Sequence, residues 1–330
     1  MHIPFTSINF NTTVSQTFPS NSQLQVTWRD LVWSAITTGK PERTYLLAHG
    51  WHSFAEQIVR EFTVYANLRA RSSICERSTL YDSLDPTEKG ATSYFMGMTM
   101  AKLFAMKLFD TPWLFHVSLA KVQKVNIKFK PNTKSQPDLI GQTRTGNWIV
   151  VEAKGRTNAF DQDALVKAKT QTRMIRKING VDPILRIALQ AYFDPVLSVY
   201  MDDPPEFDVR AWDLKLEMGI AYTRYYAFSA ALRNQRADTL DTRDISGRKF
   251  LTHSDSESGV VIGIDTEVID IISSNNLEKI ETQMLKYSAN MQVDAAEQDK
   301  SIYPDGVLIE LDERWSNEQM HREPHQRSAG

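Results

Sequence analysis

Cysteine is almost absent from this sequence, because Cys75 is the single cysteine in 330 residues. A disulfide framework and a cysteine-based zinc site are therefore both excluded. The chain also lacks an apolar run of transmembrane length, and its first residues lack the charged region and hydrophobic core of a signal peptide. We therefore expect a cytoplasmic protein that makes no use of a membrane.

Two common catalytic motifs are also missing. The sequence has no P-loop, so any ATP-driven activity would need another protein. The segment His49-Gly50-Trp51 follows an expected strand, 45–48, and resembles the oxyanion loop of α/β-hydrolases, but that family needs a G-x-S-x-G elbow, which does not occur here. His49 and His52 could also be metal ligands, yet no further ligand lies near them in the sequence. We expect them to pack or cap at the start of a helix over 53–69.

Charge is small in total and unevenly distributed. The net charge is −2, but residues 121–180 contain 13 Lys and Arg against 4 Asp and Glu, whereas residues 201–330 contain 14 against 25. A basic block is what a protein needs where it meets phosphates. One alternative is that the basic and acidic segments are simply solvated surface. Another is that the acidic segment blocks access to a site or binds a partner.

The most informative stretch runs from Lys121 to Ile178. Asp138 opens an apolar run that ends at Gly141, Gly146-Asn147 signals a turn, and residues 148–152 are aromatic and β-branched. This pattern predicts a β-hairpin that brings Asp138 close to Glu152.

Strand periodicity places Glu152 and Lys154 on one face of the second strand, with Val151 and Ala153 on the other. Charged groups on an otherwise apolar strand need a partner, water or a metal. Two neighbouring carboxylates repel each other, and a hard divalent cation relieves that repulsion. The alternative is a surface hairpin with an incidental Glu–Lys pair.

This constellation resembles the PD-(D/E)XK nuclease superfamily, which has the restriction-endonuclease-like fold. The matching residues are Pro137, Asp138, Glu152 and Lys154, followed by Gly155. The resemblance covers residues 87–193, about a third of the chain. It implies hydrolysis of DNA phosphodiesters with Mg²⁺, for which Mn²⁺ can substitute, and nothing in the residues excludes RNA.

The resemblance also implies roles for individual residues. Asp138, Glu152 and the backbone carbonyl of Ala153 would hold the metal, and Lys154 would orient the attacking water or offset transition-state charge. Superfamily members often add a carboxylate from the helix before the first core strand, for which Glu88 is the candidate; the alternative is a first-turn Glu that complements the helix dipole. They also often place a Gln or Lys on the following helix, where Gln171 and Lys167 are the candidates.

A basic face is expected on that following helix. Asp161 can cap a helix over 162–178, on which Lys169, Arg173, Arg176 and Lys177 would share one face. Together with Arg156, these side chains are the expected nucleic-acid contacts. The alternative is a solvated basic face.

The expected fold class is α/β, with a restriction-endonuclease-like mixed β-sheet core flanked by helices and with N- and C-terminal α+β elaborations. We expect an N-terminal elaboration over 1–84, a nuclease core over 85–203, a C-terminal α+β region over 204–312 and a disordered polar tail over 313–330. The expected helices are 28–37, 53–71, 87–108, 162–178, 212–232 and 277–287; the expected strands are 117–129, 138–141, 148–152, 184–193, 197–201, 260–264 and 307–311. Residues 1–22 read as an irregular or β-like arm, and 71–86 as a polar connection.

The biological setting follows from the resemblance. It suits a restriction or phage-defence effector that acts on DNA and is gated by a regulatory, ATPase or helicase partner; a homodimer is one arrangement left open. The alternative is a catalytically silent subunit with the same fold, which binds nucleic acid or a partner protein within a larger complex.

Overall fold

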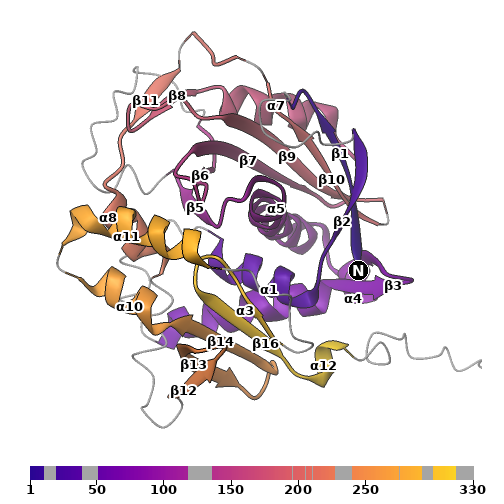
Figure 1. The fold of residues 1–330 in the computed structure, drawn as a ribbon. Helices are drawn as coiled ribbons and strands as arrows, with labels where there is room; N and C mark the ends of the chain where they lie inside the picture. The colour runs from indigo at the N-terminus through magenta and orange to yellow at the C-terminus, as the bar shows by residue number, and fades with distance from the viewer. Residues whose placement is uncertain are drawn as a thin grey trace, which may run out of the picture.

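The computed structural model describes residues 1–10, 20–38, 51–117, 136–194, 196–204, 206–209, 211–226, 240–274, 276–291 and 300–316. A large mixed sheet has helices on both faces, and a smaller antiparallel sheet lies toward the C-terminal end (Figure 1). This confirms the expectation of a mixed α/β protein in which helices flank the sheet. The helices are α1 (Trp28–Thr37), α3 (Trp51–Asn67), α4 (Thr79–Ser83), α5 (Pro86–Phe109), α7 (Gln162–Thr172), α8 (Met218–Tyr225), α10 (Thr266–Ser273), α11 (Leu277–Asn290) and α12 (Glu313–Ser316).

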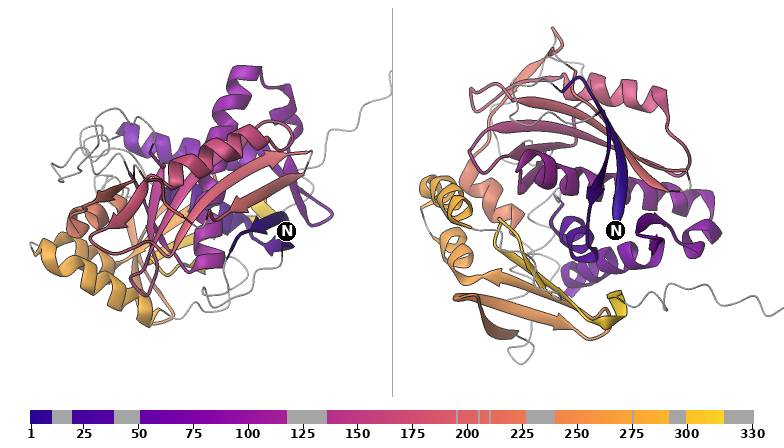
Figure 2. Two further views of the ribbon diagram at one scale, coloured as in Figure 1. Left: turned by 90° about the horizontal axis from the view of Figure 1, so that it is seen from above. Right: turned by 45° about the vertical axis from the view of Figure 1, so that its right-hand side comes forward.

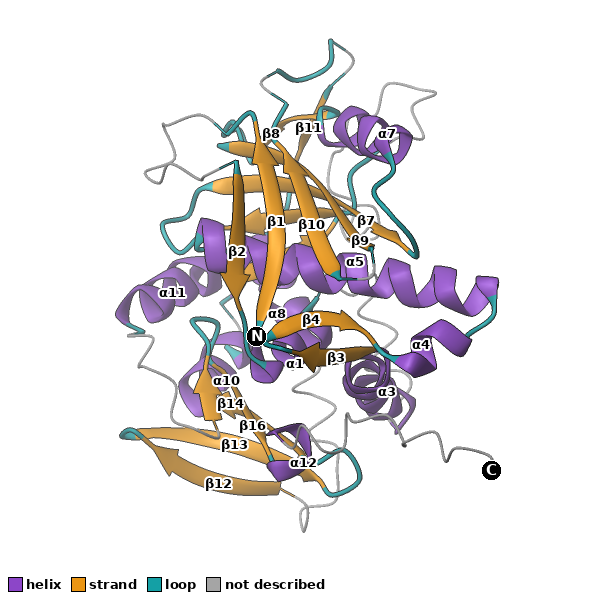
Figure 3. Ribbon diagram, turned by 90° about the vertical axis from the view of Figure 1, so that its right-hand side faces the viewer, coloured by secondary structure: helices purple, strands orange, loops and turns teal. Residues whose placement is uncertain are grey.

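The central sheet combines nine of the described strands in the order β3-β4-β1-β10-β9-β7-β6-β5, with β2 paired to β1 (Figure 3). The strands β7 and β9 pair in parallel at its centre; β9 is almost entirely buried, and β7 is buried up to Ala153, as expected for strands covered on both faces. The nine strands are β1 (His2–Ile8), β2 (Asn21–Gln25), β3 (Leu68–Arg71), β4 (Ile74–Arg77), β5 (Trp113–His116), β6 (Leu139–Gln142), β7 (Trp148–Arg156), β9 (Leu185–Phe193) and β10 (Leu197–Asp202).

Two further sheets complete the fold. One is the two-stranded pair β11 (Trp212–Leu214) and β8 (Ile175–Ile178). The other is antiparallel, in the order β12-β13-β14-β16-β15. Its strands are β12 (Leu240–Ile245), β13 (Arg248–Asp255), β14 (Val260–Asp265), β15 (Lys300–Ile302) and β16 (Val307–Leu311).

Many of the expected elements are confirmed to within four residues at each end. They are the helices α1, α3, α5 and α11 and the strands β6, β7, β9, β10, β14 and β16. The expected strand 45–48 and most of the tail, residues 317–330, lie outside the described residues, and so does His49.

The N-terminal quarter of the chain contains more regular secondary structure than the sequence predicted. Residues 1–22 were expected to be an irregular or β-like arm; the β-like alternative is confirmed for residues 2–8, which form β1, a strand that pairs in parallel with β10 inside the central sheet. Its side chains alternate between buried and partly buried, the period of a strand. Residues 71–86 are likewise more than a polar connection, because they contain β4 and α4 and bury Cys75 completely. Burial raises the pKa of the Cys75 thiol to about 12, so this cysteine is unreactive.

The helix expected over 162–178 was wrong in its second half. Helix α7 ends at Thr172, and the chain continues into β8. Ile175 and Ile178 are fully buried in this strand, which pairs with β11. Tertiary pairing with a segment almost 40 residues away therefore decides the conformation here, against the helical spacing of the sequence.

Two further expected elements remain to be compared with the structure. The segment 212–232 was expected to be one helix, but Trp212 lies in β11, and α8 begins only at Met218 and ends at Tyr225. The strand expected over 117–129 lies almost wholly outside the described residues. The strand that pairs with β6 is β5, which is earlier in the chain.

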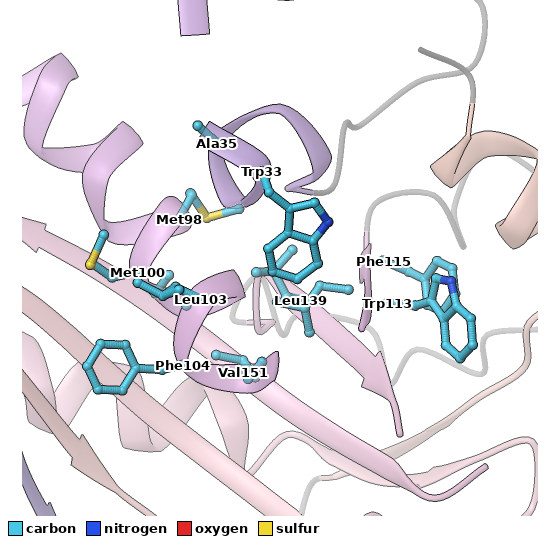
Figure 4. Packing of buried hydrophobic residues seen from close by; sticks show 14 of the residues in the cluster. Trp33, Ala35, Met98, Met100, Leu103, Phe104, Trp113, Phe115, Leu139 and Val151 are labelled. Atoms are coloured by element: carbon cyan, nitrogen blue, oxygen red, sulfur yellow. The ribbon is translucent and has the colours of Figure 1, made fainter. Parts of the chain in front are cut away.

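Helix α5 forms the centre of the core. Asp85 and Glu88 form a capping box at its start, with Pro86 in the first turn, and it ends at Asp110, which has a left-handed conformation. From Met96 onward it is buried on nearly every side, which suits its Met- and Phe-rich sequence. Figure 4 shows Met98, Met100, Leu103 and Phe104 of α5 beside Val151 of β7 and Leu139 of β6.

Two glycines allow α5 to lie directly on β7. A Cβ atom added to Gly155 would lie 1.6 Å from the backbone oxygen of Ser93, and one added to Gly97 would lie 2.8 Å from the backbone nitrogen of Gly155. Both clashes are with backbone, which cannot move aside as a flexible side chain can. Helix α5 therefore fixes the position of the end of β7 that carries Glu152 and Lys154.

The five-stranded sheet lies on the far side of α1 from the central sheet (Figures 1 and 2). A buried polar cluster joins it to the core. Lys102 of α5 donates to the Tyr225 hydroxyl at 2.5 Å, that hydroxyl donates to Asp305 at 2.6 Å, and Trp33 of α1 donates to the same carboxylate at 3.0 Å. Each group has hydrogen-bond partners, as buried polar groups need.

In the described part of the chain, every helix is too short or too polar to cross a membrane. The proposed domain boundaries stay predictions. Strand β1, from the segment assigned to the N-terminal elaboration, pairs with β10 of the segment assigned to the core.

The close packing of α5 on β7 can be tested with two glycine substitutions. We expect Gly155→Ala to lower the free energy of unfolding by about 1–3 kcal/mol or more, because its new methyl group overlaps the Ser93 carbonyl. Gly90→Ala is the control: Gly90 lies in α5 with open space around it, so alanine should stabilise the protein by roughly 0.5–1 kcal/mol. Urea unfolding curves give both values. Equal effects of the two substitutions would show that α5 does not press on β7.

Candidate active site

The β6–β7 hairpin brings the predicted carboxylates together. Leu139 pairs with Val151 and Gln142 with Trp148, and the turn between the strands contains Gly146 with a φ of 83°. A positive φ suits glycine, and the Gly146 amide closes the turn by donating to the Thr143 carbonyl at 2.9 Å. The hairpin predicted from the sequence is thus confirmed. The pairing ends at Leu139, so Asp138 lies just beyond the paired part of β6.

Glu152 is the centre of a short hydrogen-bonded chain. Its side chain is completely buried. The Asp138 amide donates to Glu152 Oε2 at 2.8 Å, and Lys154 Nζ donates to Glu152 Oε1. The Ala153 amide in turn donates to Asp138 Oδ2 at 3.4 Å. All four residues of the predicted site therefore lie within hydrogen-bonding distance of a neighbour in the set.

Electrostatics at this cluster oppose a charged Glu152. The pKa of Glu152 is raised to about 8, mainly by burial and then by the nearby Asp138 carboxylate, while Lys154 and the Asp138 amide act in the opposite direction. One ammonium group does not offset the combined effect of burial and a second carboxylate. A cation placed between Asp138 and Glu152 would.

The backbone of Ala153 faces the same space. In a strand, the N–H and C=O of one residue point toward the same edge, and the Ala153 N–H points at Asp138. The carbonyl therefore also lies at the β6 edge, beyond the last residue pair of β6 with β7. Two carboxylates and one carbonyl at one edge are oxygen donors of the kind that Mg²⁺ prefers.

Glu88 is not part of this cluster. Its carboxylate accepts the Asp85 amide at 3.1 Å in the capping box, and its side chain is exposed. It precedes Gly97, which touches β7, by nine residues, or about 13 Å along a helix axis. The geometry thus favours the capping interpretation. In the described residues, no group of three or more His, Cys, Asp or Glu is placed to hold a metal.

Helix α7 covers the face of the sheet that carries Glu152. Leu165 and Ala168 of α7 pack on Ala188, which is the residue paired with Glu152 in β9. Gln171 donates to the Gln136 carbonyl at 3.0 Å and so anchors the chain two residues before Asp138. Gln171 therefore fixes the backbone just before Asp138. Lys167 is exposed on the surface of α7.

The four expected basic residues do not share a helix face. Lys169 pairs with the buried Asp202 at 2.6 Å, and Arg176 makes two bonds of 2.8 Å to Asp213. Arg173 donates to the Glu206 carbonyl at 2.8 Å. Lys177 lies on β8. The prediction that these four residues share one helix face is thus wrong. Their contact with nucleic acid stays a prediction.

Arg156 lies nearer to the cluster. It is the last residue of β7, on the same face as Glu152 and Lys154, and it pairs with Asp161 at 2.7 Å. About 39% of each side chain in this pair is exposed. The pair is worth little in stability at such exposure, so Arg156 can exchange Asp161 for another anion.

Two residues near the carboxylates were missed by sequence reasoning. Tyr94 projects from α5 next to the contact with Gly155 and is 53% exposed; burial raises its pKa, and the Asp138 and Glu152 carboxylates raise it further. His116 ends β5; burial lowers its pKa, and Asp138 opposes that shift. The signal for Tyr94 was an aromatic residue in the polar first half of an otherwise apolar helix.

Comparison of the chain with protein-family models, with curated proteins and with solved structures gives no match. The functional argument therefore depends on the cluster itself.

The raised pKa of Glu152 predicts a pH-dependent stability. The unfolded chain loses this proton near pH 4.5 and the folded protein near pH 8, so folding retains a proton between these values. Stability of the metal-free protein should therefore fall as the pH rises from about 5 to 8, with a slope of up to about 1.4 kcal/mol per pH unit from this group.

Glu152→Gln isolates that contribution. The pKa of Glu61 is also raised to about 8 by burial, so the wild-type curve contains more than one group. The difference between wild type and Glu152→Gln, measured by urea unfolding from pH 5 to 8, should contain the Glu152 slope alone. Parallel curves for the two proteins would contradict the buried, protonated Glu152.

Proposed function

We propose that this chain is a divalent-metal-dependent nuclease that hydrolyses DNA phosphodiester bonds. The observation that carries the proposal is the completely buried Glu152, held between the Asp138 amide and Lys154 at the open end of a hairpin. The order α5, β5, β6, β7, α7, β9, interrupted only by β8 between α7 and β9 among the described elements and with β9 parallel to β7, also supports a restriction-endonuclease-like core. A role as a restriction or phage-defence effector rests on the resemblance alone.

Mg²⁺ would be held by Asp138, Glu152 and the Ala153 carbonyl, with water completing its shell. The donor set fits, because it consists of oxygen atoms, and because two carboxylates beside one ammonium leave a site that favours added positive charge. When bound, the metal supplies charge stabilisation for the phosphate and lowers the pKa of an attacking water.

Lys154 has the freedom that a reaction requires. Its ammonium group contacts Glu152, and 28% of its side chain is exposed, so the same group can reach a phosphate oxygen or a water at the surface of the site. On this face of β7, Arg156 lies two residues further along and can meet the adjacent phosphate. Together the two side chains orient the substrate backbone across the end of the strand.

The complete burial of Glu152 favours a second candidate. Both carboxylate oxygens of Glu152 already accept a hydrogen bond, one from Asp138 and one from Lys154. A catalytically silent subunit could use this arrangement as a closed structural pair, while the fold binds nucleic acid or a protein. Activity and metal dependence separate the two candidates.

Removal of either carboxylate should abolish cleavage. We expect Asp138→Ala and Glu152→Ala to stay folded and to reduce cleavage of supercoiled plasmid in Mg²⁺ by at least a hundredfold, because each removes a metal ligand. Glu278→Ala is a matched control, since Glu278 is an exposed carboxylate on α11. The wild-type reaction should stop in EDTA. Wild-type rates in a folded Asp138 or Glu152 variant would refute the proposed site.

Lys154→Met distinguishes chemistry from charge balance. If Lys154 acts on the transition state, the variant should bind Mg²⁺ and DNA normally and lose most of its single-turnover rate. If Lys154 only balances the carboxylates, the variant should lose stability in the metal-free state. Calorimetry, thermal unfolding and single-turnover cleavage decide, with the exposed Lys279→Met as control. Normal metal binding, stability and rate together would remove Lys154 from the site.

A further inference from the structure

The sheet face that carries the carboxylates continues to the opposite edge of the sheet. Lys154 pairs with Gln190, Gln190 with Tyr200, Tyr200 with Thr6, and Thr6 with Asn21. Directly paired residues project from the same face of a sheet. One row of side chains therefore runs from the candidate active site on β7 to the outer strand β2.

A groove of about 340 Å³ lies at the far end of this face. Its walls come from β1, β2, β9 and β10, and they include Asn21, Gln23, Tyr192 and Ser198. None of the eight lining residues is charged. The groove is therefore unsuited to a phosphate or a metal ion, which both need charged partners.

The lining chemistry instead fits a flat, uncharged group with donors and acceptors on its edge. The amides of Asn21 and Gln23 offer both, and Thr6 donates to Asn21 Oδ1 at 2.8 Å, which leaves the Asn21 Nδ2 as a donor for a ligand. Tyr192 adds a partly exposed ring, held by an edge contact with Phe160 at 5.8 Å between ring centroids. Amide edges and an aromatic face are the groups that proteins use to bind nucleobases.

Arg156 lies on the path between the two places. It pairs with Tyr192 in the sheet register, and Tyr192 pairs with Ser198, so the row reaches the groove directly. The basic side chain thus stands between the carboxylates, which would meet the scissile phosphate, and the groove. Gln190 is completely buried and donates to the Asp161 carbonyl at the start of α7, so a nucleic-acid strand reaches the groove along the partly exposed row of Arg156, Tyr192 and Ser198.

We propose that this groove is a subsite for one unpaired nucleobase of the strand being cut. The inference rests on the proposed nuclease function and adds to it a preference for single-stranded DNA. Strand β1 is three strand spacings from β7, or about 14 Å. At this distance the bound base lies a few nucleotides from the scissile phosphate.

The test uses the full chain and single-stranded DNA oligonucleotides in which one base at a time is removed to leave an abasic site. For the wild type, an abasic site at one position a few nucleotides from the cut should raise KM roughly tenfold, the size of a lost base stack. In the double variant Asn21→Ala/Gln23→Ala, the intact oligonucleotide should bind about tenfold more weakly, and the abasic site should add no further loss.

The control is Gln25→Ala. Gln25 is an exposed residue of the same strand that lies outside the groove, and its variant should behave as the wild type. Binding of the same oligonucleotides in EDTA, followed by fluorescence anisotropy, needs no cleavage. If the wild type cuts nothing but shows the abasic effect on binding, the nuclease proposal fails and the subsite stands.

Two results would overturn the subsite. In the first, the double variant binds and cuts as the wild type does, so that the groove contacts no DNA. In the second, the double variant loses equal affinity for intact DNA and for every abasic DNA, which would assign the groove to the sugar–phosphate backbone.

Discussion

The contact between α5 and β7 is the constraint on which the rest of the structure depends. Gly97 and Gly155 bring the two backbones together, and this fixes the end of β7 against α5, whose second half is almost entirely buried. The side chains that cannot face α5, Glu152 and Lys154, are consequently directed to the opposite face, under α7. The position of the site thus follows from the packing of α5 on one face of β7, which leaves Glu152 and Lys154 on the other face, toward α7.

Helix α5 also connects the site to the C-terminal sheet. Lys102, Tyr225 and Asp305 form a continuous buried hydrogen-bonded chain from α5 to the turn before β16. Burial lowers the pKa of Lys102 to about 7 and raises that of Asp305. Such a cluster stabilises one relative placement of its partners, because any other placement leaves buried polar groups without hydrogen bonds. The same helix thus anchors the carboxylates and the second sheet.

The sequence was sufficient where the local pattern and the tertiary structure agree. The aromatic and β-branched run over Trp148–Glu152 and the turn at Gly146 predict the hairpin, and with it the meeting of Asp138 and Glu152. The sequence was insufficient where contacts between distant parts of the chain determine the secondary structure. The helical spacing from Lys169 to Lys177 did not reveal that Ile175 pairs with Trp212, and the polar segment before α5 hid the strand that contains Cys75. The groove at Asn21 joins four strands that only the sheet order brings together.

The central claim is that Asp138 and Glu152 form a cation site that holds a proton in the absence of metal. The most direct measurement is calorimetric titration with Mn²⁺ near pH 7 in two buffers of different ionisation enthalpy, which gives the number of protons released per metal bound. Because the pKa of Glu152 is raised to about 8, the account predicts one Mn²⁺ per chain and release of close to one proton, both lost in Glu152→Gln. Absence of Mn²⁺ binding, or binding without proton release, would contradict it.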